Sequence, residues 1–218
     1  MHIKICGLTN LDDACLSLEA GADLLGFNFY RPSPRFIAPE VAAAIITTLR
    51  QALPHLPFRG VGVFVNEPLD SVRRIQEHCA LDLIQLHGDE SVAHSRALGT
   101  ATYKALRSSS HSELELQIAD WFAATIGESR EPIFLLDAAH PLLYGGTGQQ
   151  ADWSLAQTVA VRYPILLAGG LTPANVADAI AAVRPWGVDV ASGVERRPGQ
   201  KDPEKVKQFI QAAKCEKR

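Results

Sequence analysis

A regular alternation of short apolar runs with longer amphipathic stretches spans the 218-residue chain and constrains its fold more than any other feature. The runs are aliphatic or β-branched and lack polar alternation, which is typical of strands buried on both faces. We predict strands over Ile3–Cys6, Leu24–Phe29, Gly60–Val65, Leu83–Leu86, Thr102–Leu106, Ile133–Asp137, Ile165–Ala168 and Val188–Ala191. The intervening patterns predict helices over Leu11–Ala20, Pro39–Ala52, Pro68–Cys79, Glu90–Leu98, Ser112–Ile126, Trp153–Val161, Pro173–Val183 and Pro203–Lys214.

Eight strands that alternate with eight helices favour an α/β fold with a parallel sheet, because parallel strands need helical crossovers. Eight is also the strand number that closes a (β/α)₈ TIM barrel, and about 27 residues per unit suffice for one. An open doubly wound sheet is the alternative, although it usually has fewer strands. No linker, low-complexity tract or block of charge interrupts the chain, so we expect residues 1–218 to form a single domain.

Composition excludes several classes of protein. Hydrophobic residues make up 47% of the chain and the net charge is −3, which argues against disorder and against a nucleic-acid partner. The four cysteines form no CxxC pair and none has a zinc-finger spacing to histidine, so we expect no metal site. Without an apolar run of about 18 residues or a signal peptide, we expect no membrane partner and a cytoplasmic protein.

Residues able to do chemistry gather where the predicted strands end, which in a barrel is the face that carries the active site. In the first strand, alternation turns Lys4 and Cys6 inward and the two isoleucines outward. A nearby ammonium favours the thiolate, so we expect Lys4 to lower the pKa of Cys6 and make it a base or nucleophile. The alternative is a small buried hydrophobe, the usual fate of a free cysteine.

Asp137 and His87 stand at two further strand ends. Asp137 closes an apolar run, and a carboxyl in apolar surroundings can keep its proton near neutrality and act as a general acid. The alternative is an aspartate that caps the following loop. His87 shares its face with Gln85 and either binds a ligand or sits at the edge of the core.

The seventh and eighth predicted strands end in glycine-containing loops that predict an anion site. Gly170 lies in the first loop, and Ser192 and Gly193 lie in the second. Glycines let backbone N–H groups approach an anion, and this pair of loops binds phosphate in many barrels. Arg35 follows the second strand in a loop stiffened by Pro32 and Pro34, where its guanidinium could bind a carboxylate; the alternative is a solvated arginine. Asp189 and Lys4 could pair inside the barrel, since the first and eighth strands adjoin there.

A series of motifs along the chain identifies a family. In order they are KICGLT (4–9), SPRFI (33–37), VGVFVN (61–66), QLHGDE (85–90), LLD (135–137), GGTG (145–148), LAGGL (167–171) and GVDVASGVE (187–195). Each motif alone is weak, but together they resemble the phosphoribosylanthranilate isomerase family of tryptophan biosynthesis over essentially the whole chain.

The resemblance implies a TIM barrel that needs no metal or organic cofactor. It implies conversion of N-(5-phosphoribosyl)anthranilate, a small phosphorylated substrate, to 1-(2-carboxyphenylamino)-1-deoxyribulose 5-phosphate by an Amadori rearrangement. Cys6 then matches the general base, Asp137 the general acid, and Arg35 the residue near the anthranilate carboxylate. The residues that match the phosphate loops are Gly146, Gly170, Ser192 and Gly193, and those that match pocket-lining positions are His87 and Asp189.

Two alternative functions stay open at this point. A phosphosugar isomerase of the histidine pathway would share the fold, but such enzymes generally pair two aspartates. A non-catalytic phosphosugar-binding barrel would be favoured by loss of Cys6 or Asp137, and both are present. The sequence leaves the choice between monomer and homodimer open.

Overall fold

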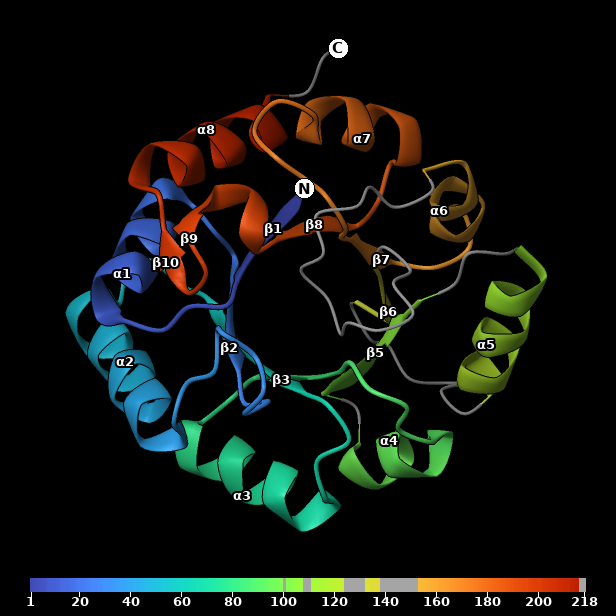
Figure 1. The fold of residues 1–218 in the computed structure, drawn as a ribbon, viewed down its shortest axis with the longest axis horizontal. Helices are drawn as coiled ribbons and strands as arrows, with labels where there is room; N and C mark the ends of the chain where they lie inside the picture. Colours follow the sequence, from blue (N-terminus) through green and yellow to red (C-terminus); the bar gives the residue numbers. More distant parts are fainter. Residues whose placement is uncertain (100, 108–110, 124–131, 138–152, 216–218) are drawn as a thin grey trace.

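Eight parallel strands close into a barrel in the computed structural model, which describes residues 1–99, 101–107, 111–123, 132–137 and 153–215. The strands are hydrogen-bonded in sequence order, and the eighth also pairs with the first (Figure 1). They are β1 (His2–Cys6), β2 (Leu24–Asn28), β3 (Arg59–Phe64), β4 (Leu83–Leu86), β5 (Thr102–Leu106), β6 (Phe134–Leu136), β7 (Ile165–Leu167) and β8 (Gly187–Val190). The predicted (β/α)₈ barrel is confirmed, and the open sheet is excluded by this closure.

A ring of helices surrounds the strands (Figure 1). In the described part of the chain they are α1 (Leu11–Ala20), α2 (Pro39–Ala52), α3 (Leu69–Cys79), α4 (Val92–Leu98), α5 (His111–Ala123), α6 (Trp153–Ala160), α7 (Val176–Val183) and α8 (Pro203–Lys214). Outward aliphatic side chains of the strands, such as Ile3 and Ile5, pack in one buried cluster with helix residues such as Leu18 and Phe209. This layer supplies most of the hydrophobic burial that holds the barrel closed.

Helix ends follow local capping chemistry, with one prediction corrected. Asp202 caps α8, because its Oδ1 accepts from Glu204 N at 3.0 Å and from Lys205 N at 3.2 Å. The predicted helix start at Pro173 is wrong: α7 begins only at Val176, after Asn175. Thr172 N instead donates to Asn175 Oδ1 at 2.8 Å, so the first residues after β7 form a turn.

A short hairpin between β8 and α8 was not predicted. After a turn of 3₁₀ helix, η1 (Ser192–Val194), the chain forms β9 (Glu195–Arg197) and β10 (Gln200–Lys201), which pair antiparallel. Figure 1 shows the hairpin beside α1, near the end of β1. Its strands are two or three residues long and charged, so they carry no apolar periodicity for sequence reasoning to detect.

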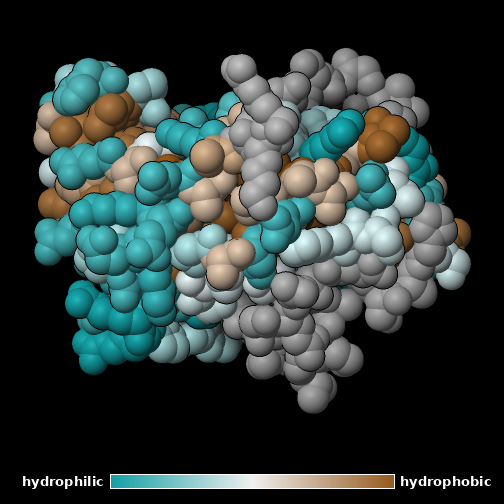
Figure 2. All heavy atoms as spheres, turned by 90° about the horizontal axis from the view of Figure 1, so that it is seen from above, coloured by the Kyte–Doolittle hydropathy of each residue, from teal (hydrophilic) through white to brown (hydrophobic). Residues whose placement is uncertain are grey.

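The surface seen in Figure 2 is mostly hydrophilic, with apolar residues in small separate groups. Two of the large exposed hydrophobic residues in the described part of the chain lie on separate elements: Leu116 is on α5, and Val161 directly follows α6. None of the described helices is long and apolar enough to cross a bilayer.

Candidate active site

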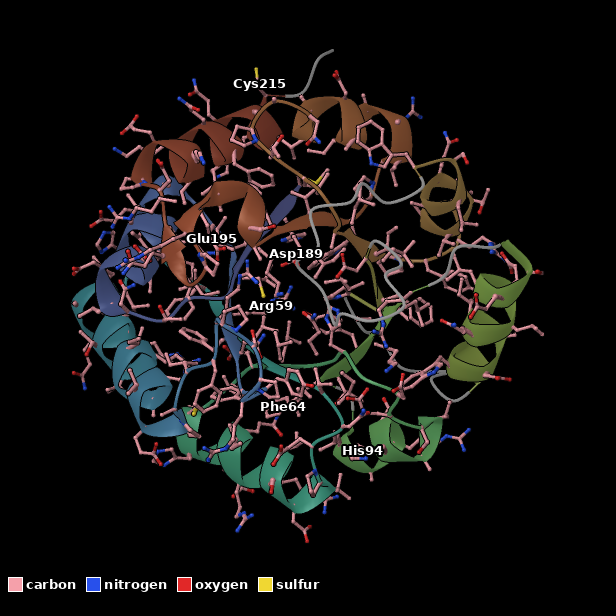
Figure 3. All side chains as sticks on the ribbon, viewed as in Figure 1. Arg59, Phe64, His94, Asp189, Glu195 and Cys215 are labelled. Carbon is pink, nitrogen blue, oxygen red and sulfur yellow. The ribbon has the colours of Figure 1, made fainter. Side chains whose placement is uncertain are left out.

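The described candidate residues meet at the mouth formed by the carboxyl ends of the strands. Cys6 ends β1, Asp189 lies on β8, His87 follows β4 and Asp137 follows β6. Asp189 lies inside the ring of strands in Figure 3, and the side chains of the other three are mostly buried. The parallel arrangement thus brings residues from both ends of the sequence to one face, as predicted.

The ammonium of Lys4 lies inside the barrel, below this mouth. It is fully buried, and its Nζ donates to Asp189 Oδ1 at 2.8 Å and to Gln85 Oε1 at 2.8 Å. Burial by itself would lower the pKa of Lys4, but the negative charge of Asp189, and that of Cys6 once it is ionised, outweigh it and raise the pKa well above its ordinary value. The predicted pair of Lys4 and Asp189 is therefore confirmed, with the amine held as an ammonium.

The electrostatic prediction for Cys6 is wrong in its net direction. Burial raises the pKa of the thiol, and Asp189 raises it further, while Lys4 and Lys201 lower it only in part. Gly26 on β2 makes the close packing possible, since a Cβ there would come within 2.9 Å of Cys6 Sγ. The free protein therefore keeps Cys6 mainly as a thiol near neutral pH, with a buried ammonium ready to stabilise the thiolate.

Asp137 and His87 form a close pair on the other side of the mouth. His87 Nε2 lies 3.3 Å from Asp137 Oδ2, and each side chain is less than a tenth exposed. The approach lacks hydrogen-bond alignment, and among the described residues Nε2 has no other partner. On its other side the ring is in contact with Gln85, whose Nε2 lies 2.7 Å from His87 Nδ1.

A pocket of about 350 Å³, counted with its opening to solvent, joins Asp137 and Asp189 to the glycine loops. Its lining includes Asp137, Asp189, Gly170, Ser192 and Gly193. Gly170 has a φ of 65°, in the left-handed region that favours glycine, and a Cβ on Gly193 would overlap the Leu171 carbonyl oxygen. Both loops therefore expose backbone to the pocket, although phosphate binding there stays a prediction. Gly146 lies outside the described residues.

Arg35 is already engaged by a carboxylate of the protein itself. Its Nε and Nη2 donate to the two carboxylate oxygens of Glu195 at 2.8 and 2.7 Å. Gly7, with a φ of 75°, makes room for this arginine, since a Cβ there would lie 2.6 Å from Arg35 Cδ. The guanidinium is thus held beside the end of β1. A substrate carboxylate would have to use its remaining nitrogen, Nη1, or displace Glu195.

Sequence reasoning missed the hairpin residues that hold Arg35. Lys201 is fully buried and donates to Glu195 Oε1 at 3.0 Å and to the Cys6 carbonyl oxygen at 2.6 Å. Burial alone would raise the pKa of Glu195, but Arg35 and Lys201 lower it below its ordinary value. Glu195 closes the GVDVASGVE motif, which was the only available signal, and nothing in the sequence pointed to Lys201.

Two comparisons of sequence show what the chain is similar to. A family model described as N-(5'-phosphoribosyl)anthranilate (PRA) isomerase matches residues 3–212. The N-(5'-phosphoribosyl)anthranilate isomerase of Trichlorobacter lovleyi is 48% identical over 216 residues, which cover 98% of each chain.

Solved structures agree with this similarity. Phosphoribosyl anthranilate isomerase from Thermotoga maritima superposes with a TM-score of 0.84 at 39% identity, covering 98% of each chain. A phosphoribosyl anthranilate isomerase in complex with reduced 1-(o-carboxyphenylamino)-1-deoxyribulose 5-phosphate gives a TM-score of 0.81 at 37% identity, with 98% of each chain covered.

Proposed function

The chain belongs to the N-(5'-phosphoribosyl)anthranilate isomerase family, and from that premise we propose that Cys6 and Asp137 perform its isomerisation as one catalytic pair. The protein is an isomerase of tryptophan biosynthesis that converts N-(5-phosphoribosyl)anthranilate to 1-(2-carboxyphenylamino)-1-deoxyribulose 5-phosphate. We further infer that residues 1–218 act as a single catalytic domain.

Asp137 is the general acid of this proposal. It protonates the furanose ring oxygen as the bond from that oxygen to C1′ breaks, which opens the ring and leaves a Schiff base between C1′ and the anthranilate nitrogen. The pocket shared by Asp137, Asp189 and the glycine loops is the observation that carries the assignment. General acid catalysis of this kind typically contributes about 10²–10⁴-fold.

Cys6 is the general base. Its thiolate removes the proton from C2′ of the Schiff base and gives an enolamine, which tautomerises to the ketone with no net oxidation. Because burial raises the pKa of Cys6, the thiolate depends on the charges of Lys4 and Lys201. The cationic Schiff base would favour the thiolate further, since an opposite charge nearby favours the charged form.

Two anchors at the ends of the substrate hold the reacting carbon between these groups. The phosphate would bind backbone N–H groups around Gly170, Ser192 and Gly193, and the anthranilate carboxylate would approach the free edge of Arg35. Both anchors are remote from C2′, so their binding energy serves to orient the sugar.

The loss of phosphoribosylanthranilate fluorescence on addition of the purified protein tests the function. We expect turnover by the wild type, and a fall in kcat of about 10²–10⁴-fold for Cys6→Ala and for Asp137→Asn, with smaller effects on KM. Cys215→Ala is the matched control, because this exposed thiol lies beyond α8. Full turnover by Cys6→Ala would refute the base assignment.

The same assay separates the alternatives. An isomerase of the histidine pathway would leave the fluorescence unchanged and convert its own phosphosugar substrate. A non-catalytic phosphosugar-binding barrel would leave the fluorescence unchanged and would convert neither substrate.

A further inference from the structure

The side-chain amide of Gln85 is held in one orientation by two donors. Its Oε1 accepts from Lys4 Nζ and from Tyr103 OH, each at 2.8 Å. An ammonium can only donate, so the amide oxygen must face Lys4 and the amide nitrogen must face the opposite way. The orientation therefore follows from the chemistry of Lys4 and does not depend on telling oxygen from nitrogen in the amide.

This orientation determines which ring nitrogen of His87 carries a proton. Gln85 Nε2 lies 2.7 Å from His87 Nδ1, and an amide nitrogen only donates. His87 Nδ1 must therefore accept, and a neutral ring with an accepting Nδ1 carries its proton on Nε2. A proton on Nδ1 would set one N–H against another at 2.7 Å in a buried position.

We propose that Gln85 is a positioning residue that locks His87 as the neutral Nε2–H tautomer and so holds an N–H donor beside Asp137. This inference rests on the proposed function, in which Asp137 donates the proton that opens the ring. The lock runs from Lys4 on β1 through Gln85 on β4 to His87, and from there to Asp137 after β6.

Two consequences make the lock useful to a general acid. A doubly protonated ring 3.3 Å from Asp137 Oδ2 would favour the ionised carboxylate and remove the proton that the reaction needs. A neutral ring avoids this, yet its N–H can still donate to the carboxylate, or to the departing ring oxygen, once the proton has been transferred. His87 Nε2 has no aligned acceptor among the described residues, so it is available for that bond.

The network also ties the acid to the base. Lys4 acts on Cys6 through its charge, and it holds Gln85 with a hydrogen bond. One buried ammonium thus stabilises the thiolate on one side of the mouth and orients the imidazole on the other.

Nitrogen-15 NMR of the histidine-labelled protein tests the tautomer without any turnover. The chain has seven histidines, and the His87 signals are those lost in the His87→Gln variant. In the wild type at neutral pH we expect a bare Nδ1 and a protonated Nε2. A proton on Nδ1, alone or together with one on Nε2, would overturn the proposal without recourse to any other variant.

Gln85→Glu tests the lock itself. The substitution keeps an acceptor for Lys4 but replaces the donor that faces His87 by an acceptor, so we expect the NMR signal to report a proton on Nδ1. We expect kcat to fall by about 10²-fold with KM little changed, because the anchors of the substrate lie elsewhere. Tyr103→Phe is the matched control for the tautomer: Lys4 still orients Gln85, so Nδ1 should stay bare. An unprotonated Nδ1 in Gln85→Glu would overturn the proposal.

Substitution of His87 provides a rescue test. The amide nitrogen of glutamine reaches the position of Nε2, whereas that of asparagine reaches the position of Nδ1. We therefore expect His87→Gln to keep at least about ten times more kcat than His87→Asn, and an equal loss in both would contradict the proposal. A wild type that shows the expected tautomer but no isomerase turnover would count against the proposed function instead, which keeps the two failures distinct.

Discussion

Replacing Lys4 by methionine removes the buried ammonium that lies against both the Asp189 carboxylate and the Cys6 thiol. A unit charge about 4 Å away acts on a thiolate by about 4 kcal/mol at an effective dielectric constant near 20. That corresponds to about three pKa units. Asp189 would also lose its ion pair at 2.8 Å, and its charge already raises the pKa of Cys6. Since the thiolate fraction falls tenfold per unit, and protonation of Asp189 can offset part of the shift, we expect kcat/KM at neutral pH to fall by about 10–10³-fold.

The rate of iodoacetamide alkylation at Cys6, followed against pH, measures this effect directly. Serine would replace the other three cysteines so that Cys6 is the only thiol. We expect the midpoint of the profile to move upward in Lys4→Met by between about one and three pH units, the lower figure applying if Asp189 takes up a proton. Breaking a buried ion pair also costs about 3–5 kcal/mol, so urea unfolding must confirm that the variant is folded under the assay conditions.

Lys104→Met is the matched control. Lys104 is a second buried ammonium, whose Nζ donates to Glu90 Oε2 at 2.6 Å near the ends of β4 and β5. Its loss should destabilise the fold to a similar extent and leave the alkylation profile of Cys6 in place. An unchanged midpoint in Lys4→Met, or an equal shift in both variants, would refute the electrostatic role of Lys4.

Three further predictions concern the hairpin, the glycine loops and an alkaline transition. Glu195→Gln leaves the buried Lys201 and the partly buried Arg35 without their carboxylate, so urea unfolding should show a loss of about 3–5 kcal/mol, against less than about 0.5 kcal/mol for the exposed Glu204→Gln. Gly193→Ala forces the loop away from the Leu171 carbonyl, so KM for the phosphorylated substrate and the inhibition constant of inorganic phosphate should both rise at least about tenfold; unchanged values would remove this loop from the anion site. Burial raises the pKa of the Cys79 thiol from 9.0 to about 11. Between these two pH values the unfolded chain loses this proton while the folded protein keeps it. The contribution of Cys79 to the free energy of unfolding is therefore fully present below pH 9 and is lost as the pH rises through 11. Urea titrations from pH 8 to 11 should show a smaller alkaline loss in Cys79→Ala, and an identical loss would contradict that origin.

Local patterns in the sequence were sufficient for the architecture. A strand buried on both faces appears in the sequence as an apolar run, and an amphipathic helix shows a 3.6-residue period. Both patterns can be recognised without knowing the rest of the chain. The same alternation correctly turned Lys4 inward with Cys6, and the order of motifs pointed to the family that the comparisons confirm. Closure of the barrel then followed from the number of strands, and with it the expectation that Cys6 and Asp137 share one mouth.

The hairpin and its charge cluster depended on tertiary structure. Arg35 meets Glu195 across 160 positions of sequence, and Lys201 reaches the carbonyl of Cys6 across 195. The strands of the hairpin are too short and too polar to leave a periodic signal. The hairpin is held by contacts of the buried Glu195 carboxylate with Arg35 and Lys201, and these contacts exist only in the folded chain.

The protonation states of the site residues likewise depended on the tertiary structure. The sequence placed an ammonium two residues from Cys6 and predicted a lowered pKa, but burial in the finished barrel outweighs that charge and raises it. Likewise the sequence placed Gln85 and His87 on one face of a strand, but the orientation of the Gln85 amide depends on its hydrogen bond to Lys4 of β1. Desolvation and hydrogen-bond direction depend on every group packed around a side chain, and most of those groups are distant in sequence. The sequence alone therefore determined which residues stand at the mouth of the barrel, and the packed structure decided their charge and orientation.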